Sequence, residues 1–189
     1  MKIGLFFGSF DPLHIGHKII ASYIANFSDI DKVMFVISPK SPFKKHVHLL
    51  DKNHRLNIVK ISINDNSKLQ VSDIEFNMPQ PSYTINTLLK IKNKNPENDY
   101  VIIMGADNLK DLHKWKDHKK ILDKHTIYVF PRPGFDIHEK HKNIKIIKGC
   151  PLMDISSSFI RNSIKANIDV SYLISQKGWE YINSMKFYK

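Results

Sequence analysis

The stretch Gly8-Ser-Phe-Asp-Pro-Leu-His-Ile-Gly-His17 follows directly on the apolar run Ile3–Phe7. The run predicts a short buried strand, and the Gly-Ser pair predicts a turn that leads the chain into a helix. Backbone amides at such a junction, together with the positive end of the helix dipole, attract phosphate. We therefore expect Gly8 and Ser9 to form a phosphate-binding turn near the start of an α/β fold.

The helix that follows is predicted over Leu13–Phe27. Its apolar residues recur at helical spacing and predict a buried arc made of Ile15, Ile19, Ile20, Tyr23, Ile24 and Phe27. His14 and His17 lie outside this arc, three residues apart, so they project from neighbouring points near the helix start. Gly16 between them lacks a side chain and allows a ligand to approach closely. Imidazoles donate hydrogen bonds and can carry charge near neutral pH, which suits a phosphorus centre that gains negative charge.

Two other interpretations of the histidine pair deserve comparison. A zinc site needs a third and usually a fourth ligand, and the neighbouring sequence offers no cysteine pair and no His-Glu-x-x-His spacing. An ordinary polar helix face is the commoner origin of a lone His-x-x-His pair. The strand and the Gly-Ser turn before the pair favour a phosphate site instead.

A second stretch, Ile155-Ser-Ser-Ser-Phe-Ile-Arg161, predicts another helix start. A serine hydroxyl there caps free amides, and the remaining amides can hold an anion. Arg161 lies in the first turns of that helix and offers a planar fork to phosphate oxygens. The alternative is a simple serine cap followed by a solvated arginine.

Apolar runs and helical stretches alternate along the chain, and no Gly-, Pro- or Ser-rich linker divides it. The alternation predicts a mostly parallel sheet flanked by helices in one domain, residues 1–189, with ligands at the carboxyl ends of the strands. The predicted strands are Lys2–Phe7, Lys32–Ser38, Leu69–Phe76, Tyr100–Met104, Thr126–Phe130 and Ile144–Ile147.

Residues 8–17 resemble the Gly-x-Phe-Asp-Pro-x-His-x-Gly-His signature of the HxGH nucleotidylyltransferases, and residues 155–161 resemble the Ile-Ser-Ser-Thr/Ser-x-Ile-Arg signature of the same superfamily. The resemblance implies a Rossmann-like fold and transfer of a nucleotidyl group. It assigns His14 and His17 to the α-phosphate, and Arg161 to the leaving pyrophosphate. The implied ATP-binding residues are Gly8, Ser9, Phe10, Gly105, Asp107, Ile155, Ser157 and Ser158. It also implies a Mg²⁺ ion held chiefly by phosphates and water, with no protein ligand assigned to the metal.

Further segments are similar to those of the bacterial nicotinate-mononucleotide adenylyltransferase family. They are Ser82–Leu88 (Ser-Tyr-Thr-Ile-Asn-Thr-Leu), Gly105–Leu109 with the later Trp115, Arg132–Gly134, and more loosely the basic loop 38–45. The resemblance implies that the mononucleotide is bound by Tyr83, Thr84, Trp115 and Arg132, and that Lys44 or Lys45 reaches phosphate. These roles are chemically reasonable, because an indole face stacks on a flat pyridine and loop amides can grip a ring carboxylate.

Each of these residues also has a simpler structural interpretation. Trp115 is expected in the core without the resemblance, and Asp107, which suits ribose hydroxyls, would also serve as a helix N-cap. Arg132-Pro-Gly is a plausible turn. The basic loop would be merely solvated, and the stretch 136–141, which contains two histidines, is expected to be an exposed loop.

The resemblance implies adenylyl transfer from ATP to nicotinate mononucleotide, which yields nicotinate adenine dinucleotide and pyrophosphate in NAD biosynthesis. A pantetheine-phosphate adenylyltransferase is the first alternative, although that family usually has Thr at the position of His14 and lacks the segment that carries Trp115. Another HxGH enzyme, such as a cytidylyltransferase for small alcohol phosphates, is the second. A nucleotide-binding regulator on the same scaffold would typically have lost an imidazole or the arginine.

Composition narrows the partners and the compartment. The net charge of +11 comes from scattered lysines and favours attraction of anionic substrates over binding of a nucleic acid polymer. The single cysteine, Cys150, excludes an internal disulfide, and the first residues do not read as a signal peptide. No apolar run approaches the roughly 20 residues that cross a bilayer. We expect a cytoplasmic protein that does not bind membranes, and the sequence leaves a homo-oligomer open.

Overall fold

The computed structural model describes residues 1–40, 48–138 and 140–189. Within these residues, six strands form one sheet in the order β3-β2-β1-β4-β5-β6, and all neighbouring pairs are parallel. The strands are β1 (Lys2–Gly8), β2 (Lys32–Ile37), β3 (Leu69–Ser72), β4 (Asp99–Gly105), β5 (Ile127–Phe130) and β6 (Ile144–Ile146). The predicted Rossmann-like α/β fold is confirmed. Strand order reverses between β1 and β4, which is where such sheets form a ligand crevice at their carboxyl ends.

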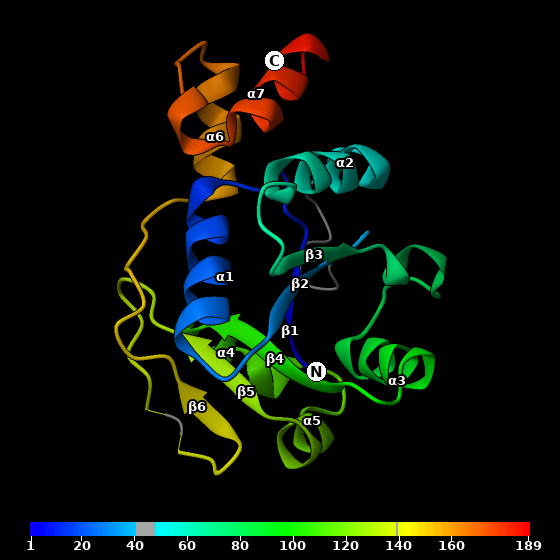
Figure 1. Ribbon diagram of the computed structural model, residues 1–189. Coiled ribbons are helices and arrows are strands. Elements are labelled where there is room, and N and C mark those ends of the chain that lie inside the picture. The colour runs from blue at the N-terminus through cyan, green and yellow to red at the C-terminus, as the bar shows by residue number, and fades with distance from the viewer. Residues whose placement is uncertain (41–47, 139) are drawn as a thin grey trace.

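Helices cover both faces of this sheet (Figure 1). The α-helices are α1 (Ile15–Phe27), α2 (Lys52–Ile63), α3 (Thr84–Lys94), α4 (Ala106–Lys110), α5 (His118–Lys124), α6 (Ser157–Lys165) and α7 (Gln176–Ser184). Short 3₁₀ turns lie at Ile74–Asn77, Leu112–Lys114 and Ser171–Leu173. No helix among the described residues is both long and apolar enough to span a membrane.

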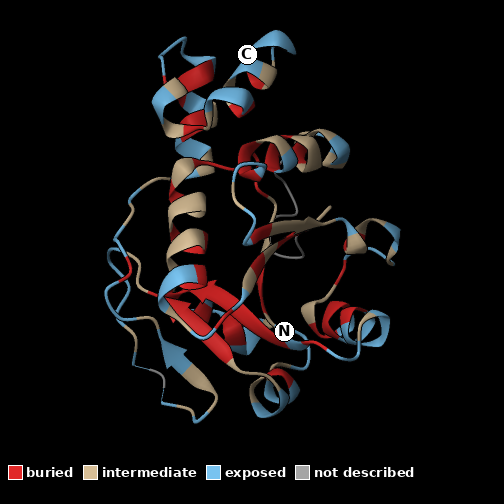
Figure 2. Ribbon diagram, viewed as in Figure 1, coloured by how far each residue is buried: buried red, intermediate tan, exposed pale blue. Residues whose placement is uncertain are grey.

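The central strands are buried on both faces, as expected for a parallel sheet with helices on each side. In β1, Phe6 joins the core beneath α1 while its neighbour Leu5 joins the core beneath α3, α4 and α5. Buried residues accordingly concentrate in the middle strands and on the inner sides of the helices (Figure 2). This packing holds the ends of β1 and β4 rigidly at the crevice.

A third apolar cluster joins α2 to the last helices of the chain. It contains Ile58 from α2, Ile160 and Ile164 from α6, and Ile182 from α7. Figure 1 shows α6 and α7 gathered beside α2, so the C-terminal segment lies next to the turn that follows β1. The first and last parts of the sequence therefore meet in one region.

Three local predictions differ from the structure. Helix α1 begins at Ile15 with His14 as its N-cap residue, two residues after the start predicted at about Leu13. Phe27, the last residue of α1, is 74% exposed and stacks on Tyr23, so it does not belong to the buried arc. The strand predicted to reach Phe76 ends at Ser72, where the Ser72 hydroxyl accepts a hydrogen bond from the Ile74 amide and a 3₁₀ turn begins.

Candidate active site

A cleft of about 500 Å³ opens at the carboxyl ends of β1 and β4. It gathers most residues that the sequence singled out: Gly8, Ser9, Phe10, His14, His17, Tyr83, Thr84, Asp107, Trp115, Arg132, Ile155, Ser157, Ser158 and Arg161. Gly105 is the exception among the described residues, since it lies at the end of β4 but not on the wall. Lys44 and Lys45 lie outside the described residues.

The two imidazoles stand together at the start of α1. Their rings stack with centroids 3.7 Å apart, and His17 Nδ1 accepts a hydrogen bond of 3.3 Å from the His14 backbone amide. A neutral His17 that accepts at Nδ1 carries its proton on Nε2, which makes that nitrogen a hydrogen-bond donor. The helix start thus presents an imidazole donor beside the free amides of the first turn.

His14 differs from His17 because it is buried. Burial, and secondarily the nearby Arg132 charge, lower the pKa of His14 to about 4. The neutral form of His14 therefore prevails at pH 7, so this imidazole offers a hydrogen bond and not a charge. Its Nδ1 is buried without a hydrogen-bond partner among the described residues. Gly16 leaves room for this imidazole, because a Cβ at that position would lie 3.1 Å from His14 Nδ1 and would require a small shift of the ring.

The turn after β1 is shaped by Phe10. This residue adopts a left-handed backbone with φ of 44°, and its buried ring packs against Phe6, Phe35 and His17. A Cβ at Gly8 would lie 2.8 Å from that ring, so only glycine fits beside it. The ring of Phe10 belongs to the core, and its backbone is the part that it can offer to a phosphate.

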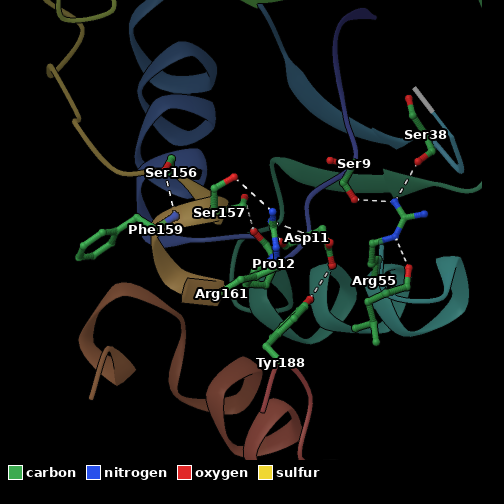
Figure 3. Close-up of polar contacts among 12 residues, drawn as sticks. Ser9, Asp11, Pro12, Ser38, Arg55, Ser156, Ser157, Phe159, Arg161 and Tyr188 are labelled. Carbon is green, nitrogen blue, oxygen red and sulfur yellow. Dashed lines mark hydrogen bonds and ion pairs between the residues drawn. The ribbon is translucent and has the colours of Figure 1, made fainter. Parts of the chain in front are cut away.

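The second motif forms the opposite wall of the cleft. The Ser156 hydroxyl caps α6 by accepting from the Phe159 amide, and the Ser157 hydroxyl donates to the Pro12 carbonyl at 2.9 Å (Figure 3). Arg161 donates to the Asp11 carbonyl at 2.6 Å and to the Ser158 hydroxyl at 3.2 Å. Helix α6 is therefore fastened to the turn of the first motif, and the simple cap with a solvated arginine is excluded as the whole explanation.

Asp107 and Arg132 meet beyond the end of β4. Asp107 lies in the first turn of α4 and is not its N-cap, which is Gly105. Its Oδ1 is 3.8 Å from Arg132 Nε, and Arg132 also donates to the Met153 carbonyl at 3.2 Å. A Cβ at Gly105 would lie 2.3 Å from Asp107 Oδ1, so this glycine makes room for the carboxylate. Arg132 also begins a turn, with the Phe135 amide bonded to its carbonyl.

The other end of the cleft holds Trp115 and the N-terminus of α3. Trp115 is half-buried against the core and lines the cleft, so it is neither a fully buried core residue nor a solvated one. Helix α3 begins at Thr84 with Tyr83 as its N-cap, and no side chain caps its first amides. These amides are available for an anionic group on a flat ring.

Two buried charged residues that support these walls were missed from the sequence. Glu75 accepts from the Ser82 and Thr87 hydroxyls at 2.6 and 2.8 Å and so fixes the start of α3. Arg55 is 1% exposed and donates to four backbone carbonyls, which belong to the two turns after β1 and β2 and to Leu50. Figure 3 shows its bonds to Ser9 and Ser38. Only the apolar character of the neighbouring residues hinted at their burial, and nothing in the sequence named their partners.

Outside the cleft, we considered the remaining reactive or metal-binding side chains of the described residues. Cys150 is a free, buried thiol whose pKa is raised to about 11 by burial. Among the described residues, no group of three His, Cys, Asp or Glu side chains is arranged to hold a metal ion. The described part of the stretch 136–141 is a loop without helix or strand, as predicted.

Comparison with known proteins agrees with this geometry. The cytidylyltransferase-like family model matches residues 5–163. A Flavobacterium psychrophilum protein named "Probable nicotinate-nucleotide adenylyltransferase" is 48% identical over 193 residues, which is 100% of both chains. The protein of the same name from Christiangramia forsetii is 47% identical over 191 residues, which is 100% of this chain and 98% of that one. The chain belongs to the nicotinate-nucleotide adenylyltransferase family.

Solved structures support the fold of this family member. The Plasmodium falciparum nicotinic acid mononucleotide adenylyltransferase complexed with NaAD superposes with a TM-score of 0.84 at 24% identity, covering 99% of this chain and 97% of that one. The same enzyme complexed with APC gives a TM-score of 0.82. At this identity the likeness concerns the fold alone.

Proposed function

We propose that the protein transfers the adenylyl group of ATP to nicotinate mononucleotide, forming nicotinate adenine dinucleotide and pyrophosphate in NAD biosynthesis. The observation that carries this proposal is the meeting of two helix starts at one cleft. The start of α1 brings two imidazoles, and the start of α6 brings Ser157 and Arg161. Membership in the family adds the acceptor. The whole chain, residues 1–189, would form one nucleotidyltransferase domain, since α7 packs on α2, a helix that also packs on the sheet. We place this enzyme in the cytoplasm.

The reaction needs positioning and charge stabilisation more than it needs a base. A phosphate oxygen of the mononucleotide is already ionised, and it attacks the α-phosphorus of ATP while the bond to the bridging oxygen of the β-phosphate breaks. We assign His17 and the neutral His14 as hydrogen-bond donors to the α-phosphate as its charge develops. Arg161 and Ser158 bind the departing pyrophosphate, and the amides after Gly8 cradle the phosphates.

The carboxylates of the cleft indicate how a Mg²⁺ ion would be held. Among the described residues, two carboxylates line the cleft, those of Asp107 and Glu75, and Glu75 already accepts hydrogen bonds from two hydroxyls. With so few free carboxylates, the described residues fit a Mg²⁺ ion that would be held chiefly by phosphate oxygens and water. When bound, such an ion neutralises charge on the leaving group. Asp107 is then left to accept from ribose hydroxyls.

The acceptor is assigned to the far end of the cleft. The half-buried Trp115 offers a stacking face, and the uncapped amides of α3 offer donors to a ring carboxylate. Arg132 lines the same cleft beside Asp107, and we assign it to the mononucleotide phosphate. Lys44 or Lys45 stays a prediction, since neither lies in the described residues.

The proposal is tested by pyrophosphate release from ATP with a panel of acceptors. The panel contains nicotinate mononucleotide, nicotinamide mononucleotide and pantetheine phosphate, with an acceptor-free control and mass detection of the product. Nicotinate mononucleotide should exceed the amide form by about 10²-fold in kcat/KM, because a neutral amide leaves donors built for a carboxylate poorly matched. A preference for pantetheine phosphate, or ATP binding without turnover, would replace the proposal with one of the alternatives.

A further inference from the structure

The carboxylate of Asp11 lies at the junction of the two motifs and is 1% exposed. Its Oδ1 accepts a hydrogen bond of 2.7 Å from the Tyr188 hydroxyl. Its Oδ2 lies 3.9 Å from Arg161 Nη1 and accepts no hydrogen bond within the described residues. One tyrosine is thus the only hydrogen-bond donor that the described residues give to this buried carboxylate, and a buried charge that loses its donor is costly.

The tyrosine comes from the far end of the chain. Tyr188 lies beyond α7, 177 positions from Asp11 in the sequence, and its hydroxyl points at the Asp11 carboxylate (Figure 3). Lys186 and Tyr188 both adopt left-handed backbone, with φ of 54° and 66°. Such conformations are unfavourable for residues other than glycine and persist where surrounding contacts maintain them. Lys186 closes α7, since its amide bonds to the Asn183 carbonyl and the next amide, of Phe187, bonds to the Ile182 carbonyl. Beyond that turn, Tyr188 is held by its hydrogen bond to Asp11.

Asp11 in turn contacts Arg161 in two ways. Its backbone carbonyl accepts the 2.6 Å hydrogen bond from Arg161 Nη1, and its carboxylate lies near the same nitrogen. Arg161 also lines the cleft, and its guanidinium is anchored at Nη1 by the Asp11 carbonyl and at Nη2 by the Ser158 hydroxyl. Burial and the Asp11 charge raise the pKa of Tyr188, which keeps its hydroxyl protonated and able to donate. Arg55 adds a second positive charge near Asp11.

We propose that Tyr188 is a positioning residue for adenylyl transfer, which acts through Asp11 to hold Arg161 at the pyrophosphate end of the cleft. The hydroxyl fixes the Asp11 carboxylate, and the fixed Asp11 segment orients the guanidinium. This inference rests on the proposed function for the role of Arg161. It predicts that the C-terminal tail, although it does not line the cleft, influences how ATP is used.

The first test replaces one hydroxyl at a time. Tyr188→Phe should lower kcat/KM for ATP about tenfold, the usual effect of one hydrogen bond to a charged group. The KM of nicotinate mononucleotide should change less than about twofold, because its subsite lies at the other end of the cleft. Tyr181→Phe is the matched control, since Tyr181 lies in α7 and bonds His54 Nδ1 at 2.8 Å without contacting Asp11. It should leave both constants unchanged. Equal kinetics for the two variants would overturn the proposal.

The second test asks whether the effect passes through Arg161. In an Arg161→Ala background, Tyr188→Phe should change kcat/KM for ATP less than about twofold, because the group that it positions is gone. The same tenfold loss in both backgrounds would show a merely structural role and overturn the proposal. If Tyr188→Phe melts below the assay temperature, Asp11→Asn takes its place in the same cycle with the same expected and contrary results.

The outcome stays distinguishable from that of the proposed function. If the wild-type protein releases no pyrophosphate with any acceptor, the proposed function fails. The wild type, Tyr188→Phe, Arg161→Ala and the double variant are then compared by calorimetric titration with a non-hydrolysable ATP analogue. Non-additive affinities would still support positioning of Arg161 by Tyr188, and additive ones would refute it.

Discussion

Arg55 provides the sharpest test of how the turns of the cleft are held. Its guanidinium is 1% exposed and makes four hydrogen bonds to carbonyls: Nε to Leu50 at 2.8 Å, Nη1 to Ser9 at 2.7 Å and Ser38 at 2.9 Å, and Nη2 to Pro39 at 3.0 Å. A planar trans peptide points its N–H opposite to its carbonyl. The bond to Ser9 therefore also sets the direction of the next amide in the phosphate turn.

The substitution Arg55→Lys keeps the positive charge but removes the planar guanidinium and its several N–H donors. An ammonium is a single donor point on a shorter chain and reaches about two of the four carbonyls. The remaining two stay buried without a donor, and each costs about 1–3 kcal/mol. We expect the free energy of unfolding to fall by about 3 kcal/mol. For a chain of this length that corresponds to a decrease of roughly 6–12 °C in Tm.

Urea unfolding monitored by circular dichroism and calorimetric melting measure this change. Arg132→Lys is the matched control, because the Arg132 side chain is partly exposed and donates a single 3.2 Å hydrogen bond to Met153. It should cost less than about 1 kcal/mol. If Arg55→Lys were as stable as the control, the four-carbonyl arrangement would not need a guanidinium, and the reasoning about buried carbonyls would be refuted.

Three further predictions concern the cleft itself. His17→Ala should lower turnover by about 10²-fold with little change in Tm, since it removes one transition-state donor; near-normal turnover in a folded variant would remove the imidazole from the mechanism. Trp115→Ala should raise the KM of nicotinate mononucleotide more than that of ATP, whereas a purely core role would instead cost about 3–5 kcal/mol of stability with both KM values intact. The pKa of His14 is lowered to about 4 in the fold against 6.5 in the unfolded chain, so the unfolded state binds more protons between these values. Stability should therefore be complete above pH 6.5 and fall by up to ~3 kcal/mol as the pH drops through 4, and His14→Gln should flatten that part of the profile measured by urea unfolding.

The sequence by itself predicted the local chemistry of both motifs. Strand, glycine turn and helix start follow one another within residues 3–17, and every group needed for a phosphate-binding helix start is a near neighbour in the chain. Capping serines and Arg161 are likewise local to residues 155–161. Such features depend on backbone conformation over a few residues, so pattern and residue type suffice to predict them.

The tertiary structure decided the burial of polar groups and the contacts between distant residues. Asp11 meets Tyr188 across 177 positions of sequence, and Arg55 finds its carbonyls in turns that other strands deliver. The periodicity of α1 predicts that Phe27 is buried, yet its side chain is 74% exposed, since burial depends on which element covers the helix there. Most buried polar groups need a partner that the fold brings to them, and no periodicity along the chain encodes where the carboxyl ends of separate strands will meet.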